Sequence, residues 1–306
     1  MKRILITGEN SYIGTSFDAF MKQYQDEYIV DIISVRDDTW KQEDFSLYDA
    51  IYHVAGIAHA DVGKVSKEQQ ELYYKVNRDL TYEVAKKFKE DRKDAFSQFI
   101  YMSSIIVYGD NASIRKKRVI TQKTKPNPSN FYGDSKLQAE LKIQPLADDN
   151  FQVCIIRPPM IYGPNSKGNY PQLRKLALKL PFFPDIPNER SMLFVGNLMI
   201  FIKEMIDGEL LTDIYCPQNN EYIRTSYMVK EIANVHEKYV KLFSFMNWSI
   251  YLLSYVPGKI GKLTNKAFGN LVYEKTWTVS SDGLKETIKK TEGKDNEQKN
   301  TNISKS

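Results

Sequence analysis

The sequence has few cysteines and few histidines. Of its 306 residues, two are cysteine and three are histidine. Cys154 and Cys216 could form at most one disulfide, and each stands in a short apolar run, where free thiols pack as small hydrophobic side chains. The histidines, His53, His59 and His236, match no metal-binding spacing, so we assign no metal. These scarcities exclude a disulfide-stapled domain and a zinc module.

An excess of charge of one sign is also absent. The 43 Lys and Arg stand against 38 Asp and Glu, and a net charge of +5 is too small to indicate nucleic-acid binding. The apolar stretch in the opening MKRILITG is too short for a signal peptide or a membrane span. We therefore expect a cytoplasmic protein with no nucleic-acid partner and no transmembrane segment.

Short apolar runs alternate with helical patterns through the first half of the chain. Residues 3–7, 28–35, 50–54, 99–102 and 153–157 are typical of buried strands, and residues from about 13, 66–90 and 132–146 are typical of helices. Such alternation indicates right-handed crossovers and a parallel sheet covered on both faces. The predicted fold class is α/β with a doubly wound parallel sheet.

Beyond residue 158 prolines interrupt the chain, so we expect shorter elements there. We predict a first domain at residues 1–165, a smaller cap at 166–284 with some elements returning to the sheet, and a disordered tail at 285–306. Residues 245–256 form the most apolar segment, which is too short to cross a bilayer. We interpret this segment as a packed cap helix, with an interfacial contact surface as the alternative.

A turn containing Gly8, Ser11 and Gly14 joins the first strand to the first helix. Small residues there let the backbone approach a pyrophosphate, and the helix start supplies N–H donors. Ser11 stands where a middle glycine is expected, but the position directly after a strand favours a dinucleotide site over an ordinary turn. We expect Tyr12 and Ile13, at the start of the helix, to belong to this site.

The end of the second predicted strand bears on the choice between NAD and NADP. An acidic residue there holds the ribose hydroxyls of NAD, whereas a 2′-phosphate requires a cation instead. Ser34 occupies roughly that position and Arg36 follows, which favours NADP(H), with NAD as the alternative. In that alternative Asp37 or Asp38 holds the ribose, and Arg36 only pairs with one of them.

Tyr132 and Lys136 are four residues apart, so they share one face of a predicted helix. A cation near a phenol lowers the pKa of the phenol, so we expect Tyr132 to exchange protons near neutral pH. Ser103 and Ser104 follow a predicted strand at its carboxyl end, where open α/β sheets place their sites. A hydroxyl there could meet Tyr132.

With these motifs the chain resembles the extended short-chain dehydrogenase/reductase family of nucleotide-sugar epimerases and dehydratases. The resemblance rests on the glycine turn, His53-Val-Ala-Gly56, Asn77 in KVNRDLT, SSIIVYG at residues 103–109, Tyr132 with Lys136, and RPPMIYGP at residues 157–164. It covers residues 1 to about 165 in the family's order. It implies a Rossmann-type NAD(P)-binding domain followed by a substrate-binding cap.

The resemblance also implies roles for individual residues. Ser104, Tyr132 and Lys136 would be catalytic, with Lys136 also on the nicotinamide ribose. The other cofactor-binding residues would include Val54, Ala55, Gly56 and Asn77. In the cap, Asn169 and Arg190 resemble a clamp for a nucleotide diphosphate, with a surface cation as the alternative for Arg190. Met160 departs from the family, which often has an asparagine there.

Ile105 and Ile106 stand where 4,6-dehydratases of the family carry an Asp-Glu pair, so we do not expect dehydration. Within the family that the chain resembles, Ser34 and Arg36 favour NADPH-dependent 4-keto reduction of a UDP-hexose or UDP-N-acetylhexosamine, in polysaccharide biosynthesis of the capsule or O-antigen type. The alternatives are C4 epimerisation of a UDP-sugar with retained NAD, and a non-catalytic dinucleotide-binding regulator. The two longest predicted helices resemble the pair through which family members dimerise, so we expect a homodimer.

Overall fold

The computed structural model describes residues 1–58, 65–93, 95–110, 112–208, 210–245, 247–276, 278–279 and 282–293. The chain folds into two units. Unit 1 comprises Met1–Gly109, Lys125–Pro158 and Leu198–Pro217, and unit 2 comprises Asp110–Thr124, Pro159–Asn197 and the chain from Gln218 onward. Residues 198–217 thus return to the unit that holds the N-terminus, whereas residues 110–124 leave it.

Unit 1 is built on a parallel sheet of six strands in the order β10-β6-β4-β3-β1-β2. The strands are β1 (Lys2–Thr7), β2 (Tyr28–Ile33), β3 (Ala50–His53), β4 (Ser97–Met102), β6 (Phe151–Ile156) and β10 (Asp213–Tyr215). The helices are α1 (Tyr12–Met21), α2 (Lys67–Tyr74), α3 (Leu80–Arg92), α4 (Phe131–Ile143) and α6 (Val195–Ile206). Short 3₁₀ and π segments add η1 (Lys22–Tyr24), η2 (Asp38–Gln42), η3 (Phe45–Leu47), η4 (Lys75–Asp79), η5 (Ile105–Tyr108) and η6 (Gln144–Leu146).

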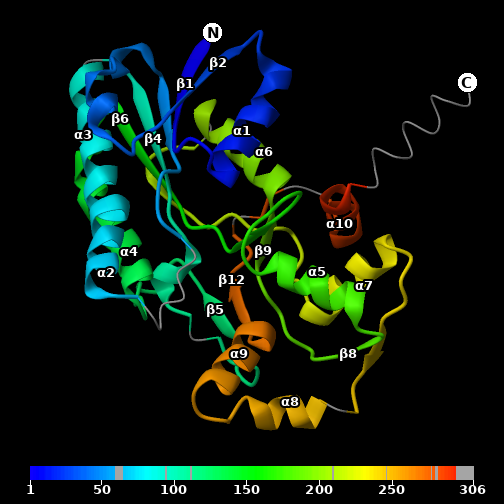
Figure 1. Ribbon diagram of the computed structural model, residues 1–306. Helices are drawn as coiled ribbons and strands as arrows, with labels where there is room; N and C mark the ends of the chain where they lie inside the picture. Colours follow the sequence, from blue (N-terminus) through cyan, green and yellow to red (C-terminus); the bar gives the residue numbers. More distant parts are fainter. Residues whose placement is uncertain are drawn as a thin grey trace, which may run out of the picture. The chain divides into compact units, whose positions relative to one another are not determined.

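The chain leaves β1 in one direction to β2 and then crosses to β3 on the other side of β1. Alternate side chains of β1 face opposite layers: Leu5 belongs to the core cluster that holds residues of α3 and α4, whereas Ile6 lies 3.0 Å from the place of a Cβ on Gly14 of α1. Helices cover both faces of the sheet (Figure 1), which confirms the predicted doubly wound, Rossmann-type class. The carboxyl end of β1 is the point where the strand order reverses, the usual ligand position in such sheets.

Unit 2 consists of shorter elements, as the prolines predicted. Its strands pair two by two: β5 (Arg118–Ile120) with β12 (Leu271–Tyr273), β7 (Met160–Tyr162) with β9 (Met192–Phe194), and β8 (Phe182–Pro184) with β11 (Lys241–Phe243). Its helices are α5 (Tyr170–Lys179), α7 (Thr225–Val235), α8 (Asn247–Leu253), α9 (Lys259–Phe268) and α10 (Leu284–Glu292).

The predicted disorder from residue 285 is wrong for α10. Its isoleucine, Ile288, is fully buried, and Thr287 forms a 2.7 Å hydrogen bond with the Tyr162 hydroxyl. The Glu292 carboxylate accepts hydrogen bonds from the Tyr170 hydroxyl and Arg174 Nε, both at 2.7 Å. A single apolar anchor and these tertiary contacts hold a helix whose composition is otherwise polar. Residues 294–306 of the predicted tail lie outside the described residues.

The predicted packed helix at residues 245–256 is also wrong in part. Residues 247–253 form α8, but Trp248 and Tyr255 keep about two thirds of their surface exposed, at 66% and 67%. Apolar side chains occur all round this segment, so only some of them can face the unit. Among the described residues, no helix is long and apolar enough to cross a membrane.

His53 links three elements of the unit 1 core through hydrogen bonds. Thr81 donates to the Asn77 carbonyl at 2.8 Å, so its oxygen accepts from His53 Nε2 at 3.0 Å, and His53 Nδ1 accepts from the Thr7 hydroxyl at 2.7 Å. Burial, with a smaller effect of the Lys136 charge, lowers the pKa of His53 to about 3. The ring is therefore neutral in the folded protein.

The neutral state of His53 makes stability depend on pH. Because its folded pKa of about 3 lies below its ordinary value of 6.5, the unfolded chain takes up the proton first as the pH falls. Between pH 5.5 and 4.5, the free energy of unfolding should fall by about 1.4 kcal/mol more in the wild type than in a His53→Gln variant. Denaturant titrations at each pH measure these free energies. An equal loss of free energy of unfolding in the two proteins would contradict a neutral His53 in the folded state.

Candidate active site

The glycine turn holds the carboxyl end of β1 against the end of β3. Gly8 has a φ of +117°, and a Cβ placed on it would lie 2.8 Å from the Ala55 nitrogen. A side chain is therefore disfavoured at Gly8 by both conformation and space. The Val54 amide donates to the Thr7 carbonyl at 3.1 Å, so Val54 and Ala55 lie directly beside the turn.

Ser11 caps α1, because its hydroxyl accepts from the Gly14 amide at 3.0 Å. The same hydroxyl would lie 2.6 Å from a Cβ on Gly14, which accounts for glycine there. Tyr12 and Ile13 are the first two residues of α1, and their N–H groups have no partner within the helix. The buried Tyr12 hydroxyl makes no hydrogen bond to any described residue. The start of α1 therefore offers unused donors, the feature that binds phosphate groups.

Ser34 directly follows β2, whose last carbonyl, that of Ile33, accepts from the Gly8 amide at 3.2 Å. The Arg36 side chain is exposed and forms no ion pair with any described residue. The two neighbouring acids are engaged elsewhere: Asp37 caps η2 by accepting from the Thr39 amide at 3.1 Å, and Asp38 pairs with Lys41 at 2.8 Å. Arg36 therefore forms no ion pair with either adjacent aspartate.

Asn77 fastens the loop after β3 to two helices. It lies in η4, a π-helical turn between α2 and α3, and is fully buried. Its carboxamide accepts from the Ile57 amide at 2.8 Å and donates to the Ile57 carbonyl at 3.1 Å and to the Ser135 hydroxyl at 3.0 Å. A Cβ on Gly56 would lie 3.1 Å from Lys136 Nζ. The structure thus brings Gly56, Asn77 and Lys136 together, as the resemblance implied.

Tyr132 and Lys136 both lie on α4, which Asn130 caps by accepting from the Gly133 amide at 3.0 Å. Lys136 is buried, and its ammonium donates to the Met102 carbonyl at 2.9 Å. Burial lowers the pKa of Lys136 to about 8, and the charge of Glu140 opposes this. The predicted helical spacing of the pair is confirmed.

The expected lowering of the Tyr132 pKa is wrong for this structure. Burial raises the pKa of the Tyr132 phenol to about 12, and a hydrogen bond with Ser104 opposes this increase only in part. Lys136 is not among the causes, since its ammonium is directed to Met102. Tyr132 is therefore a protonated phenol at neutral pH.

The two adjacent serines have different partners. Ser104 contacts Tyr132, as predicted, and caps η5 by accepting from the Ile106 amide at 3.3 Å. Ser103 instead donates to the buried Glu140 carboxylate. A Cβ on Gly133 would lie 2.7 Å from the Ile106 carbonyl, so this glycine lets α4 approach the loop that carries Ser104.

Glu140 and Arg157 form a buried ion pair beneath the site, which the sequence analysis missed. Arg157 Nε donates to both carboxylate oxygens, at 3.1 and 3.2 Å, and its Nη2 also pairs with Glu140. Arg157 Nη1 donates to the Tyr108 hydroxyl at 2.7 Å. The spacing of Glu140, one helical turn after Lys136, is a signal that could have indicated this pair.

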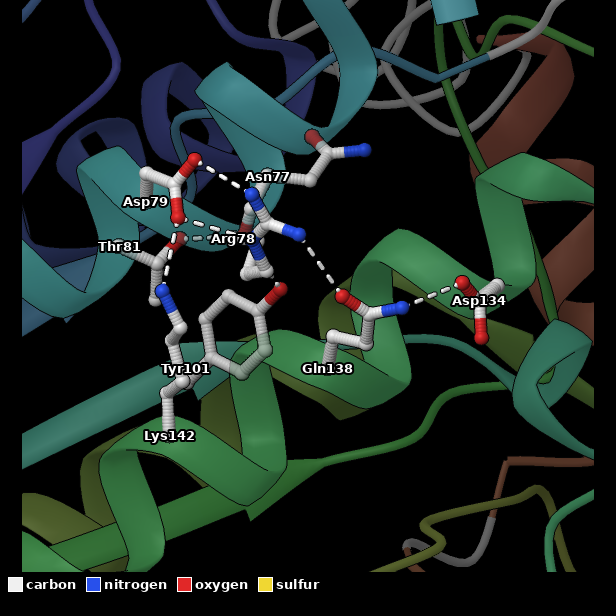
Figure 2. A network of polar contacts seen from close by, with 8 residues as sticks. All are labelled: Asn77, Arg78, Asp79, Thr81, Tyr101, Asp134, Gln138 and Lys142. Atoms are coloured by element: carbon white, nitrogen blue, oxygen red, sulfur yellow. Dashed lines mark hydrogen bonds and ion pairs between the residues drawn. The ribbon is translucent and has the colours of Figure 1, made fainter. Parts of the chain in front are cut away.

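Figure 2 shows a second polar network on the outer side of α4. Arg78 donates to Asp79 through Nε at 2.8 Å and to Gln138 through Nη1 at 2.9 Å, and Lys142 donates to Asp79 at 2.9 Å. Gln138 in turn donates to Asp134 at 2.6 Å. These contacts fasten α4 to η4, the segment that carries Asn77.

The two predicted substrate residues lie in unit 2. Asn169 is exposed at the start of α5 and makes no capping hydrogen bond through its side chain. Arg190 Nη1 donates to the Lys266 carbonyl at 2.8 Å and the Gly269 carbonyl at 3.2 Å, and burial lowers the Arg190 pKa. Arg190 is therefore anchored at the end of α9 and is not a free surface cation. Its Nε and Nη2 groups keep donors for a ligand.

The residues of unit 1 fit a nicotinamide dinucleotide. A positive-φ glycine at the strand-order reversal, open N–H groups at the start of α1 and the unpaired hydroxyl of Tyr12 suit a pyrophosphate and its neighbours. Gly56 leaves space beside the Lys136 ammonium, and Ser34 and Arg36 stand where the adenosine ribose binds in such folds.

Comparisons with known proteins agree with this geometry. The family model described as "NAD dependent epimerase/dehydratase family" matches residues 4–197. A UDP-glucose 4-epimerase of Vibrio cholerae is 29% identical over 93% of this chain and 90% of its own length. Two solved structures are similar in fold. UDP-glucuronic acid 4-epimerase from Bacillus cereus, in complex with NAD, is 15% identical with a TM-score of 0.69, over 97% of this chain and 99% of that one. RMD from Pseudomonas aeruginosa, in complex with NADPH, is 17% identical with a TM-score of 0.67, over 95% of this chain and 98% of that one.

The buried pair beneath the site yields a stability prediction. Glu140→Gln leaves Arg157 without a counter-charge in the core, so the free energy of unfolding should fall by about 3–5 kcal/mol. Glu90→Gln removes one partner of the exposed pair with Lys86 and should cost under about 1 kcal/mol. Denaturant unfolding of the two variants measures the difference. Similar losses of free energy of unfolding would show that the buried pair stabilises the fold no more than the exposed pair does.

Proposed function

The chain belongs to the NAD-dependent epimerase/dehydratase family, and on that premise we propose that it reduces the C4 keto group of a UDP-hexose or UDP-N-acetylhexosamine with NADPH. The observation that carries this proposal is the Tyr132 phenol in contact with Ser104, together with the exposed Arg36 beside Ser34. Reduction of a ketone requires a proton for its oxygen, and a phenol with a pKa of about 12 holds that proton at neutral pH.

In the proposed reaction, Tyr132 donates its proton to the C4 oxygen of the sugar, and Ser104 donates a hydrogen bond to the same oxygen. The nicotinamide, when bound, supplies the hydride that C4 receives. The hydrogen bond from Ser104 stabilises the phenolate left on Tyr132, and Lys136, charged below its pKa of about 8, donates to the ribose of the cofactor. The carbonyl thus becomes an alcohol, with the proton coming from Tyr132.

The loop after Ser104 supports reduction over dehydration. Ile105 and Ile106 begin η5 and carry no group that can exchange a proton. Removal of water from a sugar needs an additional acid and base near the triad. The residues next to Ser104 cannot supply them.

Arg36 supports NADP(H) as the cofactor. Its guanidinium is exposed next to Ser34, and Asp37 and Asp38 bind Thr39 and Lys41 instead. A 2′-phosphate would pair with this guanidinium, which no described carboxylate neutralises.

C4 epimerisation with retained NAD is the second candidate. The relative from Vibrio cholerae is named as an epimerase and matches almost the whole chain. Epimerisation uses the same Tyr132 and Ser104, but Tyr132 first accepts a proton from the C4 hydroxyl. Both reactions use the same phenol, and our reason for preferring reduction is the exposed Arg36 beside Ser34, which suits the 2′-phosphate of NADPH.

The cap supplies the proposed contacts to the nucleotide diphosphate. Arg190 can donate through Nε and Nη2 while Nη1 stays on the end of α9, and Asn169 stands at the start of α5. We also propose a homodimer formed through α3 and α4, where exposed Leu141 offers apolar surface on α4.

Turnover tests the reaction. The protein should oxidise NADPH when a UDP-4-keto-6-deoxyhexosamine is added, and Tyr132→Phe should lower this rate by about 10²–10⁴ while the Kd for NADPH stays within about twofold. The phenylalanine keeps the ring contact with Tyr73. Interconversion of UDP-sugars without net NADPH use would support the epimerase, and neither activity would support a binding role.

Cofactor choice has its own test. Arg36→Ala should raise the Kd for NADPH by about 10–100-fold, since the charged hydrogen bond to the phosphate is lost, and leave the Kd for NADH nearly unchanged. Lys41→Ala is the control, because Lys41 is a nearby exposed cation already paired with Asp38. Fluorescence titration with both dinucleotides measures these values, and equal effects of Arg36→Ala on both would rule out the phosphate contact.

A further inference from the structure

A cluster of exposed apolar side chains lies on unit 2, on α8, α9 and the segments beside them. We call it the α8–α9 surface. Its members are all exposed and large: Phe245, Trp248, Leu252, Leu253, Tyr255, Val256, Ile260 and Leu263. Isolated apolar residues are normal on protein surfaces, but a group of this size over two consecutive helices indicates a binding surface.

The helices present these side chains in an ordered way. Trp248 and Leu252 are four residues apart and share one face of α8. On α9, Ile260 and Leu263 are three residues apart, and Gly261 and Phe268 face the unit interior. α9 is thus an amphipathic helix whose exposed side is itself partly apolar.

Contacts within unit 2 hold the two helices in place. The Asn265 carboxamide donates to the Ser254 carbonyl at 3.2 Å and accepts from the Ile114 amide at 3.1 Å. Gly261 lets α9 approach the end of α8, since a Cβ there would collide with the Val256 carbonyl. Arg115 donates to the Tyr251 carbonyl at 3.1 Å and lies over the Tyr255 ring. These contacts hold α8 and α9 side by side (Figure 1).

Positive charge accompanies the apolar side chains. Residues 238–273 include five lysines and no Asp or Glu. Lys259, Lys262 and Lys266 follow the i, i+3, i+7 spacing, so they form a stripe beside Ile260 and Leu263 on α9. No described residue forms an ion pair with these three lysines. Their charge is available to an anionic partner.

We propose that the α8–α9 surface docks on a bilayer that contains anionic phospholipids. Trp and Tyr are enriched at membrane interfaces, where ring and polar edge meet hydrocarbon and headgroups, and lysines beside them attract anionic lipid. The surface combines Trp248, Tyr255 and the lysine stripe in this way. Attachment of this kind needs no spanning helix, and the described chain has none. The proposal does not depend on which nucleotide-sugar reaction the protein performs.

Other occupants fit the surface less well. A second copy docked about a two-fold axis would place the three lysines of α9 opposite the same three lysines, and residues 238–273 contain no Asp or Glu to offset them. Protein interfaces are depleted in lysine relative to the rest of the surface. The C-terminal residues 294–306 contain a single large apolar residue, Ile303, and cannot cover eight apolar side chains.

Vesicle flotation of the full chain tests the docking. The protein should float with vesicles of phosphatidylcholine and phosphatidylglycerol and much less with phosphatidylcholine alone. The Trp248 emission should shift to shorter wavelength on binding, and Trp248→Phe should keep the binding but lose most of this shift.

Two double charge-reversal variants distinguish binding through the α8–α9 surface from an effect of net charge alone. Lys259→Glu with Lys262→Glu should weaken the partition into anionic vesicles by at least about twentyfold, since each lysine contributes about fivefold. Lys259 opens α9, where an acid favours the helix, so the double variant should stay folded. Lys285→Glu with Lys289→Glu, on exposed positions of α10, makes the same change in net charge and should bind nearly as the wild type.

Three results would overturn the proposal. The first is no flotation with anionic vesicles, which would leave a protein partner as the occupant. The second is an equal loss in the two charge-reversal variants, which would mean that only net charge matters. The third is self-association in sedimentation equilibrium that Trp248→Ser with Leu252→Ser abolishes, which would make the surface an interface between copies.

Discussion

The proposed active site depends on the hydrogen bonds of the Asn77 carboxamide. The carboxamide holds both backbone groups of Ile57 and the hydroxyl of Ser135, and so joins the loop after β3 to α4. That junction places Gly56 beside the Lys136 ammonium. A buried amide that makes hydrogen bonds through both its oxygen and its nitrogen fixes distances between segments far apart in the sequence.

The electrostatics of the site follow from burial more than from the nearest charges. Burial raises the pKa of the Tyr132 phenol and lowers the pKa of the Lys136 ammonium. The Glu140 carboxylate, which Arg157 and Ser103 hold in place, opposes the lowering of the Lys136 pKa. The buried Lys136 ammonium can therefore stay charged at neutral pH, because the Glu140 carboxylate lies one helical turn away on α4. Ser104, left free of Glu140, is available to the reacting oxygen.

The sequence predicts best what local patterns encode. The strand–turn–helix at Gly8, the α/β alternation and the family resemblance are confirmed, because each depends on short-range spacing. The pKa of Tyr132 could not be predicted, since it depends on burial by residues distant in sequence. The same holds for α10, whose polar sequence folds only through tertiary contacts of Ile288, and for the anchoring of Arg190 at the end of α9. The roles of the site residues stay proposals.

The π-helical turn at Lys75–Asp79 has a consequence for how the site is encoded. Such a turn is equivalent to one residue inserted into an α-helix, and each residue of a helix turns the next by about 100°. Loss of a single residue from this segment would rotate Asn77 away from Ile57 while leaving every side chain of the site in the sequence. The position of the Asn77 amide thus depends on the number of residues in η4. A one-residue deletion there would disturb the site as directly as a substitution of Tyr132.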